Sequence, residues 1–237
     1  AARGIARAQA PFLQTKGFAV DVICHDEVPC VFDRQAVEQV VVAAGKRART
    51  QGLGLEVVGV KLEGRGNVKT DATGRTSATH IFCAGDVDGG MQFTHTAHHE
   101  GWIAGFNAAS KALGKRTKFR RLDERVVPRA TFIEPEVASV GMTESEAREK
   151  FKGVLVGRYE VAALGRAVTD SARTGLIKLV AHPKTRKLLG AHVICPHAGE
   201  LIHEAALAIY LGATVDKISD MIHAFPTYAE GLKAAAS

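Results

Sequence analysis

The sequence predicts an α/β segment followed by a separate α+β unit, and three observations lead to this prediction. Residues 78–90 form a short apolar run that ends in Gly85-Asp86 and leads through glycines into a stretch with helical spacing. From about Leu122, β-rich runs precede an amphipathic helix, which is the order of an α+β unit. The composition, 46% hydrophobic and 24% charged, fits a globular chain of one large or two small domains.

Residues 1–45 have an α/β pattern. A helix-like stretch runs to about Lys16, and the alternating β-rich run 18–25 is typical of a strand. The helix-prone residues 33–39 then lead into "VVVAAG" (40–45), whose continuous apolar character suits a strand buried on both faces.

The middle of the chain predicts small strands, then a buried strand, a glycine-rich turn and a helix. Short β-prone runs in 57–86 are divided at Gly64-Arg65-Gly66 and at Gly74, as expected of small antiparallel strands entering a buried one. After Gly89-Gly90, the apolar residues of 91–113 recur roughly at helical spacing.

The last part of the chain predicts strands and helices of the α+β unit. Residues 126–151 give a strand, a turn and a helix with Thr143 as its N-cap and Glu146 in a capping box. The β-rich runs "LIKLVAH" and "KLLGAHVICP" are separated by the turn-like "HPKTRK". The amphipathic helix that begins near Ala198 is stopped by Gly212.

Charge, cysteines and hydropathy restrict the classes of function. The net charge is +6, and the basic cluster 114–125 is interpreted as a solvated linker rather than a nucleic-acid site, because no interleaved aromatics or binding motif accompany it. Cys24 and Cys30, with His25 between them, allow a redox pair or half a metal site; both are disfavoured because no C-x-x-C or second ligand set is present. Without an apolar run of membrane length or a signal-like start, we expect a cytoplasmic protein that binds neither nucleic acid nor membrane.

Gly85-Asp86 is the first candidate ligand site. A carboxylate at the carboxyl end of a buried strand, before a helix, lies where ligands bind in α/β proteins. Such an Asp can accept hydrogen bonds from sugar or ribityl hydroxyls, while the helix N-terminus favours an anion or an electron-rich ring. Asp86 can equally be an N-cap with no other role.

Four stretches together resemble the class I pyridine nucleotide-disulfide oxidoreductases, the family of glutathione reductase, dihydrolipoamide dehydrogenase and mercuric reductase. "TSATHIFCAGDV" followed by "MQFTHTAHHEG" is similar to the second FAD-binding fingerprint, and residues 40–56 are similar to the return into the FAD domain. Residues from 127 onward resemble the C-terminal dimerisation domain. The resemblance implies the tail of an NAD(P)-binding Rossmann-type domain (1–45), the second segment of the FAD domain (46–122) and an α+β dimerisation domain (123–237).

The resemblance also implies roles for individual residues. Asp86 would bind the ribityl chain of FAD, with Gly85 allowing close backbone approach, and the helix beginning at Thr94, His95 and Thr96 would aim its N-terminus at the isoalloxazine. His95 falls where dihydrolipoamide dehydrogenases often carry "LAH". The two histidines that follow, at 98 and 99, are interpreted as exposed helix residues.

The C-terminal motif departs from the disulfide reductases of the family, which end in His-Pro-Thr-x-x-Glu. Here "FPTYAE" keeps Glu230 but places Phe225 at the histidine position, and phenylalanine cannot move a proton. This favours the mercuric reductase-like branch, although the ending "KAAAS" lacks that branch's cysteine pair. His223 is a candidate substitute for the acid-base, and a structural role for it is favoured.

The family's G-x-G-x-x-G, its redox-active C-x-x-x-x-C and its NAD(P)H loop are not in this sequence. We therefore expect the C-terminal half of an oxidoreductase that passes electrons from NAD(P)H through FAD to a disulfide, a metal ion or another acceptor. The alternative is a dimerisation module without activity of its own. A homodimer through 123–237 and weak binding of FAD are expected, and no metal site is assigned.

Overall fold

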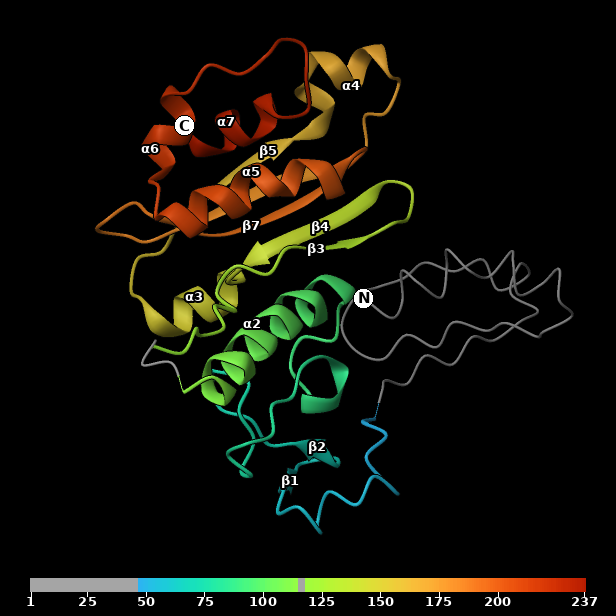
Figure 1. Cartoon of the computed structure of the whole chain (residues 1–237). Coiled ribbons are helices and arrows are strands. Elements are labelled where there is room, and N and C mark those ends of the chain that lie inside the picture. The colour runs from blue at the N-terminus through green and yellow to red at the C-terminus, as the bar shows by residue number, and fades with distance from the viewer. Residues whose placement is uncertain (1–46, 115–117) are drawn as a thin grey trace, which may run out of the picture. The chain divides into compact units, whose positions relative to one another are not determined.

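The structure is a computed structural model that describes residues 47–114 and 118–237 (Figure 1). The elements expected in 1–45, together with Cys24 and Cys30, lie outside the described residues. The chain divides at about residue 124 into two compact units. We describe the described part of each unit by itself, as the N-terminal unit (within Gly45–Glu124) and the C-terminal unit (Arg125–Ser237).

The N-terminal unit begins with a small antiparallel hairpin. Strand β1 (Leu62–Glu63) pairs with β2 (Asn67–Val68), and the predicted turn lies between them. Val60, Val68 and Ala78 form a small core beneath this hairpin. The prediction of small antiparallel strands divided at glycines is confirmed here.

The buried strand expected before Gly85-Asp86 does not form in the described residues. Residues 79–84 hold an isolated bridge, between Arg75 and Phe82, and Cys83 and its neighbours are only half-buried. A strand is defined by a continuous ladder to a neighbour, and within the described part of the unit no strand runs alongside this segment. The segment is therefore an irregular connection that leads into the 3-10 helix η1 (Asp86–Asp88).

The long helix α2 (Thr94–Ala112) follows the glycine-rich turn, as predicted. Asn107 is fully buried and fixes the helix to two segments: its Nδ2 donates to the carbonyls of Thr73 and Arg120, both at 2.9 Å, and its Oδ1 accepts from the Arg120 amide at 2.8 Å. The Arg120 guanidinium lies 4.2 Å from the ring centroid of Trp102. These contacts hold α2 against the segments on both sides of it in sequence.

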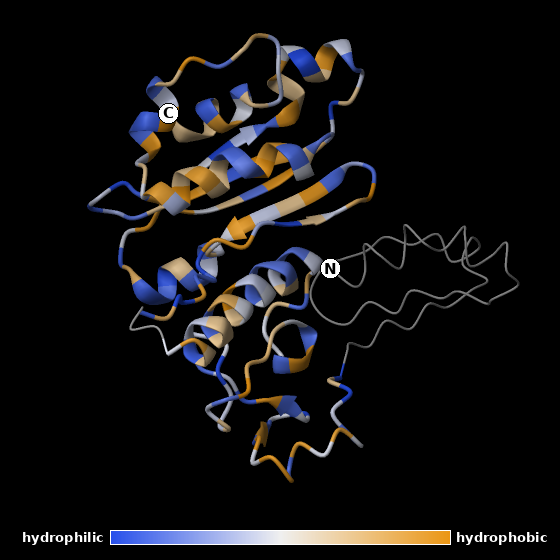
Figure 2. Ribbon diagram, in the orientation of Figure 1, coloured by the Kyte–Doolittle hydropathy of each residue, from blue (hydrophilic) through white to orange (hydrophobic). Residues whose placement is uncertain are grey.

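The C-terminal unit is built on an antiparallel five-stranded sheet with the order β3-β4-β7-β6-β5. Its strands are β3 (Arg129–Thr131), β4 (Glu136–Gly141), β5 (Leu155–Glu160), β6 (Leu176–Ala181) and β7 (Leu188–Cys195). The runs predicted as β6 and β7 are confirmed, with the turn between them. Figure 2 shows hydrophobic, orange stretches along these strands, as the buried core requires.

Helices pack against this sheet and share one core with it. Helix α5 (Ala198–Leu211) lies against β7 and β4, and α7 (Glu230–Ala236) lies against β5 and β6. Helix α3 (Glu144–Lys150) has Thr143 as its N-cap in the predicted capping box with Glu146. Shorter elements complete the unit: η2 (Val161–Ala163), α4 (Gly165–Thr169) and α6 (Val215–Asp220).

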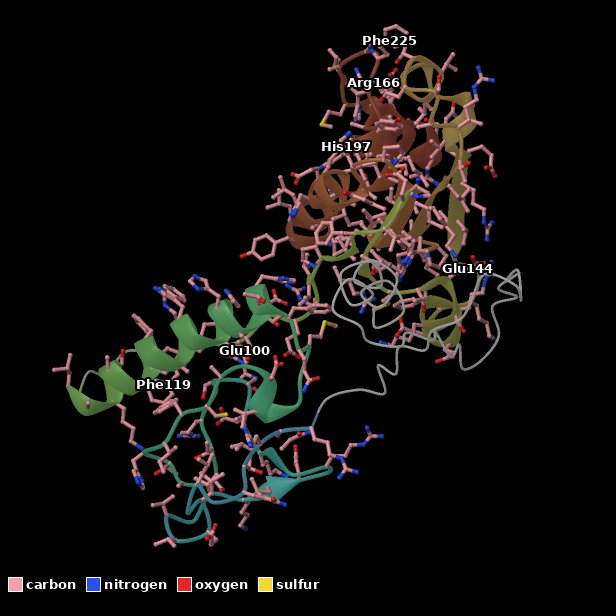
Figure 3. All side chains as sticks on the ribbon, turned by 90° about the vertical axis from the view of Figure 1, so that its right-hand side faces the viewer. Glu100, Phe119, Glu144, Arg166, His197 and Phe225 are labelled. Carbon is pink, nitrogen blue, oxygen red and sulfur yellow. The ribbon has the colours of Figure 1, made fainter. Side chains whose placement is uncertain are left out.

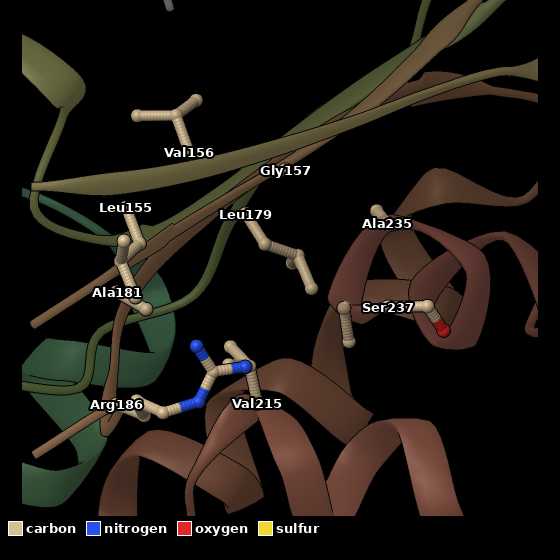
Figure 4. Close-up of a pocket in the computed structure, with 10 residues that line it drawn as sticks. Leu155, Val156, Gly157, Leu179, Ala181, Arg186, Val215, Ala235 and Ser237 are labelled. Carbon is tan, nitrogen blue, oxygen red and sulfur yellow. The ribbon is translucent and has the colours of Figure 1, made fainter. Parts of the chain in front are cut away.

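A cavity of about 190 Å³ lies within the C-terminal unit (Figure 4). Its lining comes from β5, β6 and the last residues of α7, and Arg186, which pairs with Asp216 at 2.7 Å, stands beside it. None of the residues assigned to a site from the sequence lines this cavity. No helix in the described ranges is long and apolar enough to span a membrane.

Candidate functional site

The turn at Gly85 is the centre of the candidate site in the N-terminal unit. Gly85 has φ 85° and ψ −168°, a backbone conformation that is essentially restricted to glycine. A Cβ atom at this position would lie 3.3 Å from the Cβ of Ala97 on α2. Gly85 is therefore required both by its backbone angles and by its close approach to the helix.

Asp86 begins η1 and is exposed, as a residue that binds a ligand must be. Its carbonyl accepts a hydrogen bond from Gln92 Nε2 at 3.2 Å, which fixes the backbone of the turn. Within the turn, Asp88 Oδ1 accepts from the Gly90 amide at 3.0 Å. Asp86 does not cap α2, because that helix begins eight residues later with Phe93 as its N-cap, so the N-cap alternative is wrong for this helix.

The N-terminus of α2 carries Thr94, His95 and Thr96. Phe93 has no side-chain oxygen with which to cap the helix, and the first-turn amides of a helix have no partner within it. The Thr96 hydroxyl accepts from the Phe93 amide at 3.1 Å and also contacts the Met91 carbonyl. The ring of His95 stacks on that of Phe93 with centroids 5.2 Å apart. This terminus therefore presents free N–H groups beside an exposed imidazole.

Glu100 is a residue of this site that the sequence analysis missed. It is only 5% exposed, and its Oε2 accepts from the Gly85 amide at 2.5 Å. Burial raises the pKa of the Glu100 carboxyl, the Gly85 amide lowers it, and the negative charges of Asp88, Glu124 and Asp86 raise it further. Only the folded turn brings positions 85 and 100 together, so no local sequence pattern announces this contact.

Histidines 98 and 99 are exposed on α2, as predicted. The nearby Cys83 thiol has its pKa raised to about 11 by burial and by the charges of Asp88 and Glu100. It is therefore protonated at neutral pH and is a poor nucleophile. Among the described residues, no group of three His, Cys, Asp or Glu side chains is arranged to hold a metal ion.

In the C-terminal unit, Glu230 is the first residue of α7. Its Oε2 accepts from the Thr227 amide at 3.0 Å, and the Thr227 hydroxyl donates to the Ala224 carbonyl at 2.7 Å. Phe225 is 79% exposed and lies against Gly165. Glu230 thus holds the segment that precedes α7, next to a phenylalanine that faces solvent (Figure 3).

His223 lies two residues before Phe225, and its side chain is only 3% exposed. Its Nε2 is 2.9 Å from Glu204 Oε1 on α5, and its Nδ1 is 3.1 Å from the Met221 carbonyl. Both partners are acceptors, so both ring nitrogens can donate only when the imidazole is protonated. The ring is thus held between Glu204 on α5 and the backbone of its own segment.

Apolar side chains are exposed on two neighbouring parts of the C-terminal unit. The first group lies on α5, on the half of the helix that carries Glu204. The second group lies in the segment 221–225, on either side of His223, whose ring is hydrogen-bonded to Glu204. That bond brings the segment against α5 near Glu204, and the exposed apolar side chains of these two parts are together called here the apolar face. Its members are Leu207, Tyr210, Leu211, Met221, Ile222 and Phe225.

Two family models match separate parts of the chain. Residues 19–101 match the family described as pyridine nucleotide-disulphide oxidoreductase, and residues 127–236 match the dimerisation domain of that family. The chain therefore belongs to the class I pyridine nucleotide-disulfide oxidoreductases, as the resemblance implied.

Individual members of the family are similar to the chain in sequence. It is 44% identical over 200 residues to a dihydrolipoyl dehydrogenase of Thermus scotoductus, covering 84% of this chain and 42% of that protein. It is 40% identical over 199 residues to a mercuric reductase of Staphylococcus aureus, covering 84% of this chain and 35% of that protein. The chain thus spans about two fifths of the length of these relatives.

Solved structures agree in fold. The HOCl-induced flavoprotein disulfide reductase RclA of Escherichia coli is 30% identical, with a TM-score of 0.74, over 84% of this chain and 45% of that one. LpdA of Mycobacterium tuberculosis is 28% identical, also with a TM-score of 0.74, over 84% of this chain and 42% of that one. The fold class predicted from the sequence is confirmed.

Proposed function

We propose that the chain is the C-terminal half of an FAD-dependent oxidoreductase that passes electrons from NAD(P)H through FAD to a disulfide, a metal ion or another acceptor. The observation that supports this most strongly is the order of the two family matches, 19–101 and then 127–236. In this proposal residues 1–45 are the tail of the NAD(P)-binding domain, 46–122 the second segment of the FAD domain, and 123–237 the dimerisation domain.

The residues of the N-terminal unit fit an FAD. Gly85 permits close backbone approach, and the exposed Asp86 carboxylate is able to accept hydrogen bonds from ribityl hydroxyls. The uncapped N–H groups at Thr94, His95 and Thr96 favour an electron-rich ring edge on which negative charge develops. When bound, FAD supplies two-electron transfer between the nicotinamide and the acceptor.

The C-terminal unit supports a homodimer through 123–237. Ile222 is 92% exposed and Leu211 is 70% exposed, although both are large apolar residues. Large apolar residues exposed in such number favour an interaction site, and two-fold symmetry would pair the apolar face with its own copy.

Within the segment 221–230 we assign proton transfer to His223 and a positioning role to Glu230. Phe225 has no ionisable group, and His223 is the imidazole of this segment, with its Nε2 2.9 Å from Glu204 Oε1. Glu230 holds the segment through the Thr227 amide. The exposed Phe225 instead offers an apolar contact to an acceptor or to the second copy of the chain.

Flavin binding tests the cofactor proposal. FAD fluorescence is titrated with the purified chain, with Asp86→Ala and with Glu56→Ala, which removes an exposed carboxylate elsewhere in the same unit. We expect the wild type and Glu56→Ala to bind FAD weakly and equally, and Asp86→Ala to bind about tenfold less tightly. If Asp86→Ala binds as the wild type does, Asp86 is not an FAD ligand.

Light scattering tests the dimer. At tens of micromolar chain we expect a dimer for the wild type, and a monomer for the double variant Leu211→Asp, Ile222→Asp. Val57→Asp is the matched control, because Val57 is 84% exposed but belongs to the N-terminal unit. A monomeric wild type contradicts the homodimer. A wild type that dimerises but binds no FAD favours the alternative, a dimerisation module without activity of its own.

A further inference from the structure

Glu100 is a buried carboxylate without a cationic partner. It lies on α2, beside the turn that carries Gly85 (Figure 3), and it is 5% exposed. None of the ion pairs formed among the described residues includes Glu100. A buried charge that lacks a counter-ion lowers stability, so its presence needs a reason other than packing.

The hydrogen bond of Glu100 provides that reason. Its Oε2 accepts from the Gly85 amide at 2.5 Å, and Gly85 also packs against Ala97, one turn earlier on the same side of α2. The two contacts fix Gly85 in its glycine-only conformation of φ 85° and ψ −168°. Because Asp86 is the next residue, the same contacts constrain the backbone from which its carboxylate extends.

The residues around Glu100 are acidic and make an ionised carboxylate costly at this position. Asp88, Glu124 and Asp86 raise the free energy of the ionised Glu100. A glutamine has an oxygen that accepts the same hydrogen bond without this cost. The essential feature of position 100 is therefore an acceptor oxygen at the right place. Replacing Glu100 with Gln tests this directly, because it keeps the acceptor and removes the negative charge.

We propose that Glu100 is a positioning residue for the cofactor site, holding the Gly85 amide so that Asp86 is fixed toward the ribityl chain of FAD. This inference rests on the proposed function, which assigns Asp86 to FAD. It gives a role to a residue of the stretch 91–101 for which the resemblance implied none. It also states that the site is formed by the pairing of the turn with the helix.

The experiment compares three variants of the purified chain. Glu100→Ala removes the acceptor, Glu100→Gln keeps it, and Asn107→Ala destabilises the same helix through the Thr73 and Arg120 contacts without touching the turn. FAD affinity is measured by fluorescence titration. The Gly85 amide is followed by NMR, where a short hydrogen bond to a carboxylate shifts the proton downfield and slows its exchange.

We expect Glu100→Ala to weaken FAD binding about tenfold and to lose the protected Gly85 amide, with Glu100→Gln within about threefold of the wild type. Asn107→Ala should lower stability while the folded protein keeps its FAD affinity and the Gly85 signal. If Glu100→Ala binds FAD as tightly as the wild type, or if Asn107→Ala weakens binding equally, the positioning role is wrong. If the wild type itself binds no FAD, the proposed function fails and this role fails with it, even where the Gly85 signal shows that the hydrogen bond exists.

Discussion

Asn107→Ala should be among the most damaging single substitutions in the N-terminal unit. The side chain is fully buried and makes three hydrogen bonds, of 2.9, 2.9 and 2.8 Å, to Thr73 and Arg120. At about 1 kcal/mol for each bond lost, the free energy of unfolding falls by about 3 kcal/mol. A unit of this size is stable by roughly 8 kcal/mol, so more than a third of its stability would disappear.

The chain offers a selective probe for this measurement. Trp102 is the single tryptophan of the sequence, and it lies on α2 under the Arg120 guanidinium. Its fluorescence therefore follows the N-terminal unit, while far-UV circular dichroism follows both units. With a urea dependence of about 1 kcal/mol per molar, the fluorescence midpoint should fall by about 3 M.

Two further variants sharpen the test. Asn107→Asp keeps the acceptor for the Arg120 amide but turns a carboxylate oxygen toward the Thr73 and Arg120 carbonyls in a fully buried site, so its midpoint should be no higher than that of Asn107→Ala. His99→Ala, on the exposed side of the same helix, should leave the midpoint unchanged. A fall of less than 0.5 M for Asn107→Ala, a value of about half a kcal/mol, would refute the argument that these buried bonds hold α2 in place.

Four other predictions follow from particular contacts. Burial raises the pKa of Glu100 in the folded state, so the stability that its protonation contributes is present below the ordinary carboxyl pKa of 4.5 and is lost as the pH rises through the raised pKa. The stability of Glu100→Gln relative to the wild type should therefore increase between pH 4 and pH 7, as measured by the urea midpoint at each pH. Thr143→Ala removes the N-cap of α3, which accepts from the Glu146 amide at 3.2 Å, and should cost about 1 kcal/mol by chemical denaturation followed by circular dichroism. A Cβ at Gly157 would overlap the Ala235 carbonyl, so Gly157→Ala should cost about 2 kcal/mol and speed amide exchange in α7. Gly105→Ala meets nothing within 4 Å on the exposed side of α2 and should instead stabilise the N-terminal unit by about 0.5–1 kcal/mol; a loss of stability there would show that the helix needs a glycine.

Much of the fold follows from the sequence because its signals are local. The capping box of Thr143 and Glu146 and the stop of α5 at Gly212, where φ is 65°, involve residues within one or two turns of each other. The strand order is different, since β7 lies between β4 and β6 and only the packed sheet decides this. The segment 79–84 also shows that a sequence does not reveal the partner of a strand. Its apolar character predicts a strand, but a strand forms only where a neighbouring strand pairs with it.

The candidate site divides in the same way. Gly85 and Asp86 stand in a recognisable stretch, and the sequence alone predicts them as site residues. Glu100 is fifteen residues away from Gly85, in the stretch 91–101, and the sequence gives it no role, although its hydrogen bond holds the turn. Residues that support a site act through contacts that the folded chain creates, so sequence patterns identify the ligand-facing residues first.

The closing segment shows how a family motif can lose its histidine and keep its carboxylate. Glu230 accepts from the Thr227 amide at 3.0 Å, so it stabilises the start of α7 whatever residue occupies position 225. Its retention therefore follows from local structure and does not require proton transfer. The imidazole–carboxylate pair is instead formed by His223, two residues before Phe225, with Glu204 of α5. A reductase that uses this segment for proton transfer would have to bring its acceptor to His223, and Phe225 would then serve only as an apolar contact.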